Sequence, residues 1–392
     1  METKIDWKKV EKLYKSLGVP KEYYAPPFAA IPYNRYFGGL SDRSTGKTTN
    51  WLLFGMCANK LYGTKIQYVR STEDELSPSH ARELVKTIRE YDDGRYIREL
   101  TDGEYNGIYY HWRAFYYAAF DDKGERVAVA PEPFINCLSI DRADDYKSSY
   151  NAPDGDIILW DEFISRKRFT RVNECVDFLD LCKTIIRDRT TAIIVMLANT
   201  ILLTSPIYED LEIQKEIRTM KEKGDRRQIV TEKGTHMFWE IIDADISRSD
   251  KRQEVNRLYF GFKNPKLNAI TGEGLYAFDS VPHIPPRDES FVLREGRLYL
   301  QTGAELLRLE ICYQDGVGKH IQVHRATRTY DDSIILSLEP PVLAGHLWGF
   351  GTPKLTKAIG TFLAANKVFF STNEVGTLFN EYLKRYKQLK LK

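Results

Sequence analysis

The feature that most constrains this chain is the segment SDRSTGKT at residues 41–48. It follows the P-loop pattern G-x-x-x-x-G-K-[ST], except that Ser41 replaces the first glycine. A strand-like apolar stretch precedes it at residues 33–39, and apolar residues at helical spacing follow it at residues 47–61. This order of strand, loop and helix lets backbone N–H groups and the helix N-terminus surround phosphate groups. The segment therefore predicts a nucleotide-binding loop.

The residue types in this loop indicate distinct roles. We expect Lys47 to reach the β- and γ-phosphates and the Thr48 hydroxyl to bind Mg²⁺, which implies ATP and Mg²⁺ as cofactors. A bare G-K-[ST] also occurs by chance, so the interpretation depends on the flanking strand and helix. The expected nucleotide-binding residues are Ser41, Asp42, Arg43, Ser44, Thr45, Gly46, Lys47, Thr48 and Thr49.

A second signal is the segment IILWDE at residues 157–162, an apolar strand that ends in two carboxylates. This is the Walker B form, in which the strand delivers Asp161 to the Mg²⁺ ion and places Glu162 to orient or deprotonate the attacking water. The expected metal ligands are thus Thr48 and Asp161. The alternative is an apolar strand that is simply followed by an acidic turn. The phosphate-loop pattern upstream argues against this alternative.

A third apolar strand, at residues 191–199, ends in Asn199. In P-loop ATPases with a catalytic glutamate, a polar residue at the end of the neighbouring strand can contact the γ-phosphate or the attacking water. Asn199 is a candidate for that role. The alternative is an asparagine that caps the following turn.

The wider pattern predicts an α/β architecture. Over residues 33–211, near-continuous apolar strands alternate with helices, which is typical of a central, mostly parallel sheet. We expect an N-terminal helix and extension at residues 1–32, an ATPase domain at residues 33–211, a connecting region at residues 212–290 and a smaller α+β domain at residues 291–392.

Composition narrows the class of protein. The chain has 392 residues, with 57 Lys and Arg against 55 Asp and Glu, so its net charge names no partner. Its five cysteines show no C-x-x-C spacing, so neither a disulfide framework nor a zinc site is expected, which suits a reducing cytoplasm. The N-terminus lacks an apolar signal region and the most apolar run is too short to span a bilayer, so we expect neither secretion nor membrane insertion.

Taken together, these segments resemble the DNA-packaging ATPases of small, protein-primed tailed phages of the Picovirinae type. The resemblance covers about residues 33–205 well and the C-terminal part only in its layout. It rests on matches, in order, at residues 36–48, 67–70, 159–164, 186–189 and 197–199. This family belongs to the additional-strand, catalytic-glutamate branch of P-loop NTPases, close to the HerA/FtsK translocases.

The resemblance implies an ATP-driven translocase that packages double-stranded DNA into a viral procapsid, at its portal, as a homo-oligomeric ring. A pentamer is implied for the ring, and participation of a structured RNA is left open. The expected location is the cytoplasm of the host cell, with transient attachment to the procapsid and no membrane partner.

The resemblance also assigns two arginines. Arg43 corresponds to an arginine inside the phosphate loop, and Arg187 to an arginine that enters the active site of the neighbouring subunit. An alternative for Arg187 is a surface ion pair with Asp188 or Asp180. The expected catalytic residues are therefore Glu162, Arg187, Arg43 and Asn199.

Other positions differ from the family pattern or match it only loosely. Ser44, like Ser41, replaces a glycine, which reduces the freedom of the loop to adopt positive φ. Nucleotide binding should survive because Gly46 and Lys47 are intact. Lys147 matches a lysine that is also thought to act across the subunit interface.

The second domain is expected, by the same resemblance, to be a vestigial RNase H-like nuclease that grips DNA. Two-metal cleavage requires a cluster of carboxylates, and the candidates do not follow a convincing strand pattern: Glu310, Asp331, Asp332 and Glu339. Two alternatives stay open, namely a terminase-like enzyme with an active nuclease and a soluble P-loop NTPase regulator without a DNA partner. Basic residues such as Arg325, Arg328 and the tail at residues 384–392 could meet DNA phosphates or could line solvated faces.

Overall fold

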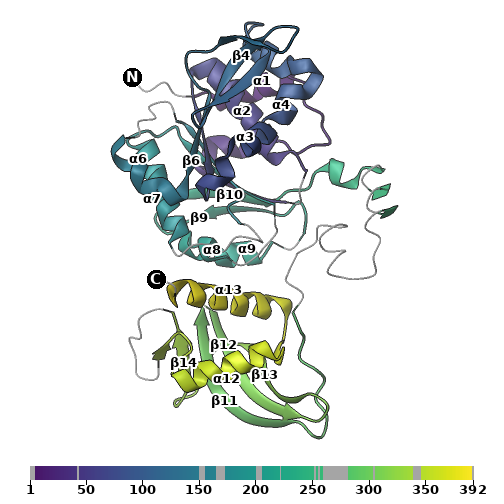
Figure 1. The fold of residues 1–392 in the computed structure, drawn as a ribbon, viewed down its shortest axis with the longest axis vertical. Helices are drawn as coiled ribbons and strands as arrows, with labels where there is room; N and C mark the ends of the chain where they lie inside the picture. Colours follow the sequence, from purple (N-terminus) through teal and green to yellow (C-terminus); the bar gives the residue numbers. More distant parts are fainter. Residues whose placement is uncertain are drawn as a thin grey trace.

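In the computed structural model, the described residues are 5–41, 44–149, 155–164, 173–199, 205–220, 222–250, 253–254, 257–258, 281–302, 305–338 and 346–390. They form two units, each built on one sheet (Figure 1). The first unit, drawn in purple to teal, contains a ten-stranded sheet, and the second, in green to yellow, contains a six-stranded sheet. None of the described helices is both long enough and apolar enough to cross a membrane.

The centre of the first sheet is parallel. Its strands lie in the order β6, β2, β7, β8, β1 and β10, and every neighbouring pair among them is parallel. Their bounds are Tyr36–Leu40 (β1), Ile66–Arg70 (β2), Ile135–Ser139 (β6), Ile157–Asp161 (β7), Ile193–Ala198 (β8) and His236–Ile241 (β10). Strand β8 therefore lies between β1, which leads into the phosphate loop, and β7, which ends in Asp161. This inserted strand is the additional strand that the resemblance implies, so the fold class is confirmed for the first unit.

Both faces of this central sheet are buried. Successive residues of a strand point to opposite faces, and in β7 Ile157 and Leu159 join one hydrophobic core while Ile158 and Trp160 join the other. The first core is covered by α1 (Trp7–Ser16), α2 (Lys47–Tyr62), α3 (Pro78–Leu84), α4 (Lys86–Glu90) and α5 (Arg95–Leu100). The second core is covered by α7 (Glu174–Ile186), α8 (Pro206–Asp210) and α9 (Gln214–Arg218). Burial on both faces explains why these strands are apolar throughout.

Antiparallel strands extend the sheet at both ends. Beyond β6 lie β3 (Gly107–His111), β4 (Ala114–Phe120) and β5 (Arg126–Val129), and at the other end β9 (Arg226–Val230) pairs with β10. Strands β9 and β10 fall within residues 212–290, where the sequence predicts a connecting region. The structure corrects that boundary, because residues 226–241 complete the first sheet.

The second unit is an α+β domain. Strands β11 (Val292–Thr302), β12 (Glu305–Gln314) and β13 (Gly318–Ala326) form an antiparallel meander. Strand β14 (Ile334–Ser337) adds in parallel beside β11, followed by β15 (His346–Trp348), and β16 (Val368–Phe370) adds beside β13. Helices α12 (Pro353–Ala364) and α13 (Asn373–Lys390) complete the domain. The α+β class expected for this part of the chain is thus observed, and its RNase H-like character stays a prediction.

The two units meet where α13 faces α8 and α9 (Figure 1). Arg218, at the end of α9, forms an ion pair with Glu305 of β12, and its Nε lies 3.3 Å from Oε1 of Glu374 at the start of α13. Arg385 of α13 lies 3.8 Å from the carboxylate of Glu209 in α8. The described contact between the units is therefore rich in ion pairs.

Candidate active site

Four segments of the first unit end at the same edge of the sheet. Strands β1, β2, β7 and β8 are parallel, so their carboxyl ends point the same way. The phosphate loop follows β1, Arg70 ends β2, Asp161 ends β7 and Asn199 follows β8. In open α/β sheets this edge is where ligands bind. The topology thus brings together residues that are more than 150 positions apart, such as Lys47 and Asn199, which are separated by 152 positions.

Two of the described residues of the phosphate loop have positive φ. Gly46 has a φ of 83° and is the N-cap of α2, and a Cβ atom at this position would lie only 3.0 Å from Nδ2 of Asn50 and from Cδ1 of Tyr23. A side chain there would be strained by the positive φ and would crowd these atoms, so glycine is strongly favoured. Ser44 also has a positive φ, of 63°, although it is not glycine. The loop thus reaches a left-handed conformation at Ser44 despite the restriction that the sequence implies.

Ser41, which replaces the first glycine of the pattern, is part of the loop's internal structure. Its hydroxyl lies 3.1 Å from the hydroxyl of Thr45, and both side chains are buried. Its backbone N–H donates to the carbonyl of Ala198 on β8 at 3.1 Å. The carbonyl of Thr45 in turn accepts from the N–H of Tyr24 in the N-terminal extension at 3.0 Å. These bonds fix the loop from both sides.

The first turn of α2 carries the residues expected to bind the phosphates and the metal ion. Lys47 is buried, and its ammonium group donates to Oδ1 of Asn199. The Thr48 hydroxyl donates to Oδ1 of Asp161 at 3.1 Å. Hard oxygen atoms from a hydroxyl and a carboxylate, side by side next to a phosphate loop, fit Mg²⁺. Thr49 follows in the same helical turn and is half-buried, whereas Asp42 and Arg43 lie outside the described residues.

Glu162 is held by two donors at the end of β7. Its φ of 56° lies in the left-handed region, which turns the chain away from the strand directly after Asp161. Asn199 donates from Nδ2 to Oε1 of Glu162 at 2.5 Å, and Arg70 donates from Nη2 to Oε2 at 2.8 Å. Because Asn199 also accepts from Lys47, one amide connects the phosphate-binding amine to the expected general base. The structure thus brings together Lys47, Thr48, Asp161, Glu162 and Asn199, as the sequence predicts.

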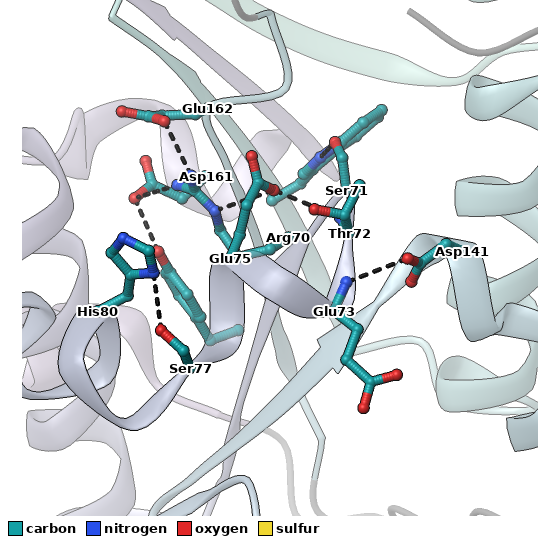
Figure 2. A network of polar contacts seen from close by, with 12 residues as sticks. Arg70, Ser71, Thr72, Glu73, Glu75, Ser77, His80, Asp141, Asp161 and Glu162 are labelled. Atoms are coloured by element: carbon teal, nitrogen blue, oxygen red, sulfur yellow. Dashed lines mark hydrogen bonds and ion pairs between the residues drawn. The ribbon is translucent and has the colours of Figure 1, made fainter. Parts of the chain in front are cut away.

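Arg70 is a component of the site that the sequence assigned to no role. Figure 2 shows its guanidinium among three carboxylates: Glu162, Asp161 at 3.6 Å from Nη1 and Glu75 at 3.5 Å from Nε. Burial lowers the pKa of Arg70, but the neighbouring Tyr68 and the carboxylates raise it more, so the net shift is upward and Arg70 stays charged. The only sequence signal was a basic residue ending an apolar strand in one of the segments that carries the resemblance.

Tyr68 completes the surroundings of Asp161. Its hydroxyl donates to Oδ2 of Asp161 at 2.9 Å, and the ring is buried. Burial, together with the Asp161 charge, raises the pKa of Tyr68 well above its ordinary value, so the hydroxyl remains a donor. Asp161 therefore accepts from Thr48 on one oxygen and from Tyr68 on the other.

A cavity of about 400 Å³ lies next to these groups. Its lining includes Thr48, Arg70 and Glu162 from the strand ends and His80 and Leu84 from α3. The cavity is large enough to hold water molecules beside the Glu162 carboxylate. The geometry thus supports a site in which a general base and a metal-binding pair face one cavity.

The residues expected to act across a subunit interface are placed only in part. Arg187 is exposed at the end of α7, with a φ of 51°, and its N–H donates to the carbonyl of Lys183 at 3.0 Å. Its action on a neighbouring subunit stays a prediction. Lys147 belongs to α6 (Ala143–Ser149), and its side chain lies outside the described part of the chain.

The carboxylates of the second unit are dispersed among basic groups. Glu310 is buried and lies 3.2 Å from Arg308 and 3.4 Å from both Arg287 and Nε2 of His324. The hydrogen bond with His324 lowers the pKa of Glu310. Asp332 forms an ion pair with Arg297, and Glu339 lies outside the described residues. Within the described ranges, no group of three or more His, Cys, Asp or Glu side chains is arranged to hold a metal ion.

Comparisons with known proteins identify the fold. No protein-family model matches the chain, and no curated protein sequence matches it. Among solved structures, the Phi-28 gp11 DNA packaging motor is 15% identical and covers 94% of this chain and 98% of its own, with a TM-score of 0.54. The viral genome packaging motor assembly of bacteriophage Phi-29 is also 15% identical and covers 93% of this chain and 99% of its own, with a TM-score of 0.55. The chain therefore shares the fold of phage packaging motors across both units.

Proposed function

We propose that this chain is an ATPase that drives double-stranded DNA into a viral procapsid. One observation carries the proposal: Lys47, Thr48, Asp161, Glu162 and Asn199 converge at the carboxyl edge of an additional-strand P-loop sheet. The same chain has the two-unit fold of phage packaging motors. The convergent side chains support ATP hydrolysis, and the shared fold supports coupling of that hydrolysis to DNA movement.

Each polar group of the site has a defined task in hydrolysis. Lys47 neutralises charge on the β- and γ-phosphates, and Thr48 and Asp161 hold Mg²⁺, which when bound offsets the negative charge that accumulates on the phosphates. Glu162 orients the attacking water and takes its proton. Asn199 bonds to both Lys47 and Glu162 and so fixes the position of one head group relative to the other. Tyr68 orients the Asp161 carboxylate.

The partners follow from the same proposal. The chain acts as a homo-oligomeric ring on the procapsid portal, in the cytoplasm of the host cell, with a pentamer as the expected ring and a structured RNA as an open component. Arg187 enters the site of the neighbouring subunit, where a guanidinium stabilises the charge of the transition state. Arg43 assists from within the phosphate loop. The second unit grips DNA as a vestigial nuclease, and its basic residues track the phosphate backbone without reading sequence.

The deciding experiment measures phosphate release by the full-length chain with and without double-stranded DNA. The proposal expects DNA to stimulate hydrolysis, and the same stimulation with DNA of unrelated sequence. The matched control is Lys47→Ala, which should show no hydrolysis under either condition. Hydrolysis that DNA leaves unchanged would instead favour a P-loop NTPase regulator without a DNA partner.

A mixing experiment tests the ring. Subunits carrying Glu162→Gln keep Arg187, and subunits carrying Arg187→Ala keep Glu162, so mixed rings regain activity where an intact arginine meets an intact base. Neither variant alone should be active. If mixed rings form, as shown by mass, and no activity returns, Arg187 does not act across the interface.

A further inference from the structure

The hairpin between β3 and β4 presents a tryptophan to solvent. Trp112 is 88% exposed, the largest exposure among the large hydrophobic side chains in the described residues. Tryptophan is a residue type that is strongly buried on average. The turn also places Trp112 and Arg113 at positive φ, 46° and 60°, which favours Asn-Gly rather than these two residues. A two-residue hairpin turn of this type requires positive φ at both positions, so the turn itself accounts for the backbone conformation. Nothing in the folding of the hairpin requires an exposed indole at its tip.

The tip of this hairpin, residues 111–113, is held in place by contacts with neighbouring segments. The carbonyl of Arg113 accepts from the N–H of Cys137 on β6 at 2.7 Å. The Arg113 guanidinium forms an ion pair with Glu73, which also lies 3.0 Å from Arg142. The His111 ring stacks on the Trp112 ring with centroids 5.6 Å apart. The tip is therefore a fixed platform that points the indole outward.

The tip lies at the edge of the sheet that carries the active site. Strand β4 runs antiparallel to β6, with Ala114 opposite Asn136, and β6 is parallel to β2. The start of β4 is therefore at the same edge as the carboxyl ends of β2 and β7. The η2 turn, a 3-10 helix at Glu73–Leu76, follows β2 at this edge of the sheet. It contacts the hairpin tip through Glu73 and the active site through Glu75.

Two residues of η2 connect the tip to the catalytic carboxylate. Glu73 pairs with Arg113 of the tip, and its N–H donates to Asp141 at 3.1 Å (Figure 2). Glu75 lies 3.5 Å from Arg70, which donates to Glu162. A shift of the tip that moves Glu73 therefore also moves Glu75, and with it the charge that competes with Glu162 for the Arg70 guanidinium.

We propose that the tip docks against a neighbouring copy of this chain and that η2 reports the contact to Glu162. The inference rests on the proposed function, because a ring places the active-site edge of one subunit against the next copy. The contact is head-to-tail, so each copy presents its tip to a different surface of its neighbour. Trp112 supplies the aromatic anchor typical of protein interfaces. Glu73 and Glu75 act as positioning residues.

The charge around the tip favours a protein over a nucleic acid. The charged groups around it are the cations Arg113, Arg142 and Arg126, the last of which lies over the Tyr109 ring that stacks on His111, and the anions Glu73, Asp141 and Asp145. Affinity for nucleic acid comes mainly from an excess of positive charge facing phosphates, and no such excess exists among these groups. An exposed indole in a nearly neutral setting instead fits the desolvated core of a protein interface.

The first test compares self-association of full-length Trp112→Ala with wild type by sedimentation velocity, in the presence of ATP, Mg²⁺ and double-stranded DNA. The matched control is Tyr33→Ala, which removes another exposed aromatic ring, 73% exposed, from a different part of the surface. We expect Trp112→Ala to raise the midpoint concentration of association at least tenfold, as truncation of an anchoring tryptophan does. Tyr33→Ala should change it less than twofold, and the basal hydrolysis of dilute protein should be unchanged in both variants.

A second readout follows the indole itself. Iodide should quench Trp112 in dilute protein and lose access to it when the protein associates, and the Trp112→Phe variant identifies the signal that belongs to this residue. Quenching that persists in the associated protein would exclude the tip from the interface. A loss of DNA affinity in Trp112→Ala at equal association would show that the occupant is nucleic acid, which also overturns the proposal.

The reporting step is tested by Glu73→Gln and Arg113→Gln, singly and together. We expect each to shift the association midpoint less than Trp112→Ala does, to reduce the stimulation of hydrolysis in fully associated protein, and to show little further loss in the double variant. Unchanged stimulation in both single variants would disprove the reporting step. If wild type hydrolyses ATP but never associates, the inference fails and the ATPase assignment survives; if wild type does not hydrolyse ATP at all, the proposed function fails.

Discussion

Replacement of Glu162 by glutamine separates binding from chemistry. The amide cannot take a proton from water, and a general base contributes roughly 10²- to 10⁴-fold to a rate, so kcat should fall by this factor, or about 3–5.5 kcal/mol. Nucleotide affinity should change less than threefold, because Lys47 and Thr48 bind the phosphates and the metal ion. Single-turnover hydrolysis and binding of a fluorescent nucleotide measure the two quantities separately.

The structure also sets the expected effect of Glu162→Gln on stability. Both oxygens of Glu162 accept hydrogen bonds, one from Asn199 and one from Arg70, and glutamine keeps only one acceptor atom. Arg70 retains Asp161 and Glu75 as partners, and the Glu162 side chain is 33% exposed. The loss in unfolding free energy should therefore be about 1 kcal/mol, the scale of a partly exposed pair. Thermal unfolding of the full chain measures it.

Glu75→Gln is the matched control for this experiment. It makes the same chemical change to another carboxylate that contacts Arg70 and lines the same cavity. Because Glu75 does not meet the attacking water in our assignment, its kcat should stay within tenfold of wild type. Normal hydrolysis by Glu162→Gln, or an equal loss in Glu75→Gln, would refute the identification of the base.

Three further predictions concern binding, the metal ion and the second unit. Lys47→Ala should abolish hydrolysis and weaken binding of ATP more than binding of ADP, as titration calorimetry can show, because the amine is assigned to the β- and γ-phosphates. Tyr68→Phe should raise the Mg²⁺ concentration for half-maximal activity about tenfold, because it removes a buried hydrogen bond to the charged Asp161 carboxylate. Such bonds contribute about 1.5–3 kcal/mol. The effect should not vary between pH 6 and 9, because the raised pKa of Tyr68 keeps its hydroxyl protonated. The full-length chain should not cleave DNA in Mg²⁺ or Mn²⁺, and cleavage that disappears in Asp331→Ala would restore the terminase-like alternative.

The elements that the sequence predicts well are those whose signal is local. The phosphate loop, the β7 strand with its two carboxylates and the β8 strand ending in Asn199 each combine an apolar run with polar residues directly after it. Strand β9, by contrast, lies at the edge of the sheet with most of its residues exposed or half-buried, so it has no apolar run to reveal it. Strands β15 and β16 have only three residues each, too few for any period to show.

The role of Arg70 could not be read from the sequence for a different reason. Its partners are spread along the chain, with Glu162 lying 92 positions away, and each pairing depends on which strands are neighbours in the sheet. The sequence predicts that β2 and β7 exist but not that they lie side by side. The ion pair between Arg70 and Glu162 is therefore a consequence of topology.

The geometry of the site finally depends on the register of the sheet. In the ladder, Leu40 of β1 pairs with Ala198 of β8, and Leu197 pairs with Asp161 of β7, so Asn199 emerges beside both the phosphate loop and Glu162. A slip of β8 by one residue would move Asn199 by about 3.3 Å and break its bonds to Lys47 and Glu162 together. Hydrophobic alternation normally fixes register, but both faces of β8 are apolar and buried, so its sequence carries no alternation. The register must instead come from the shapes of side chains in the two cores, such as Trp160 between β7 and α7, where its ring lies 4.3 Å from that of Phe178. Packing remote from the nucleotide thus sets the position of a group at the centre of the chemistry.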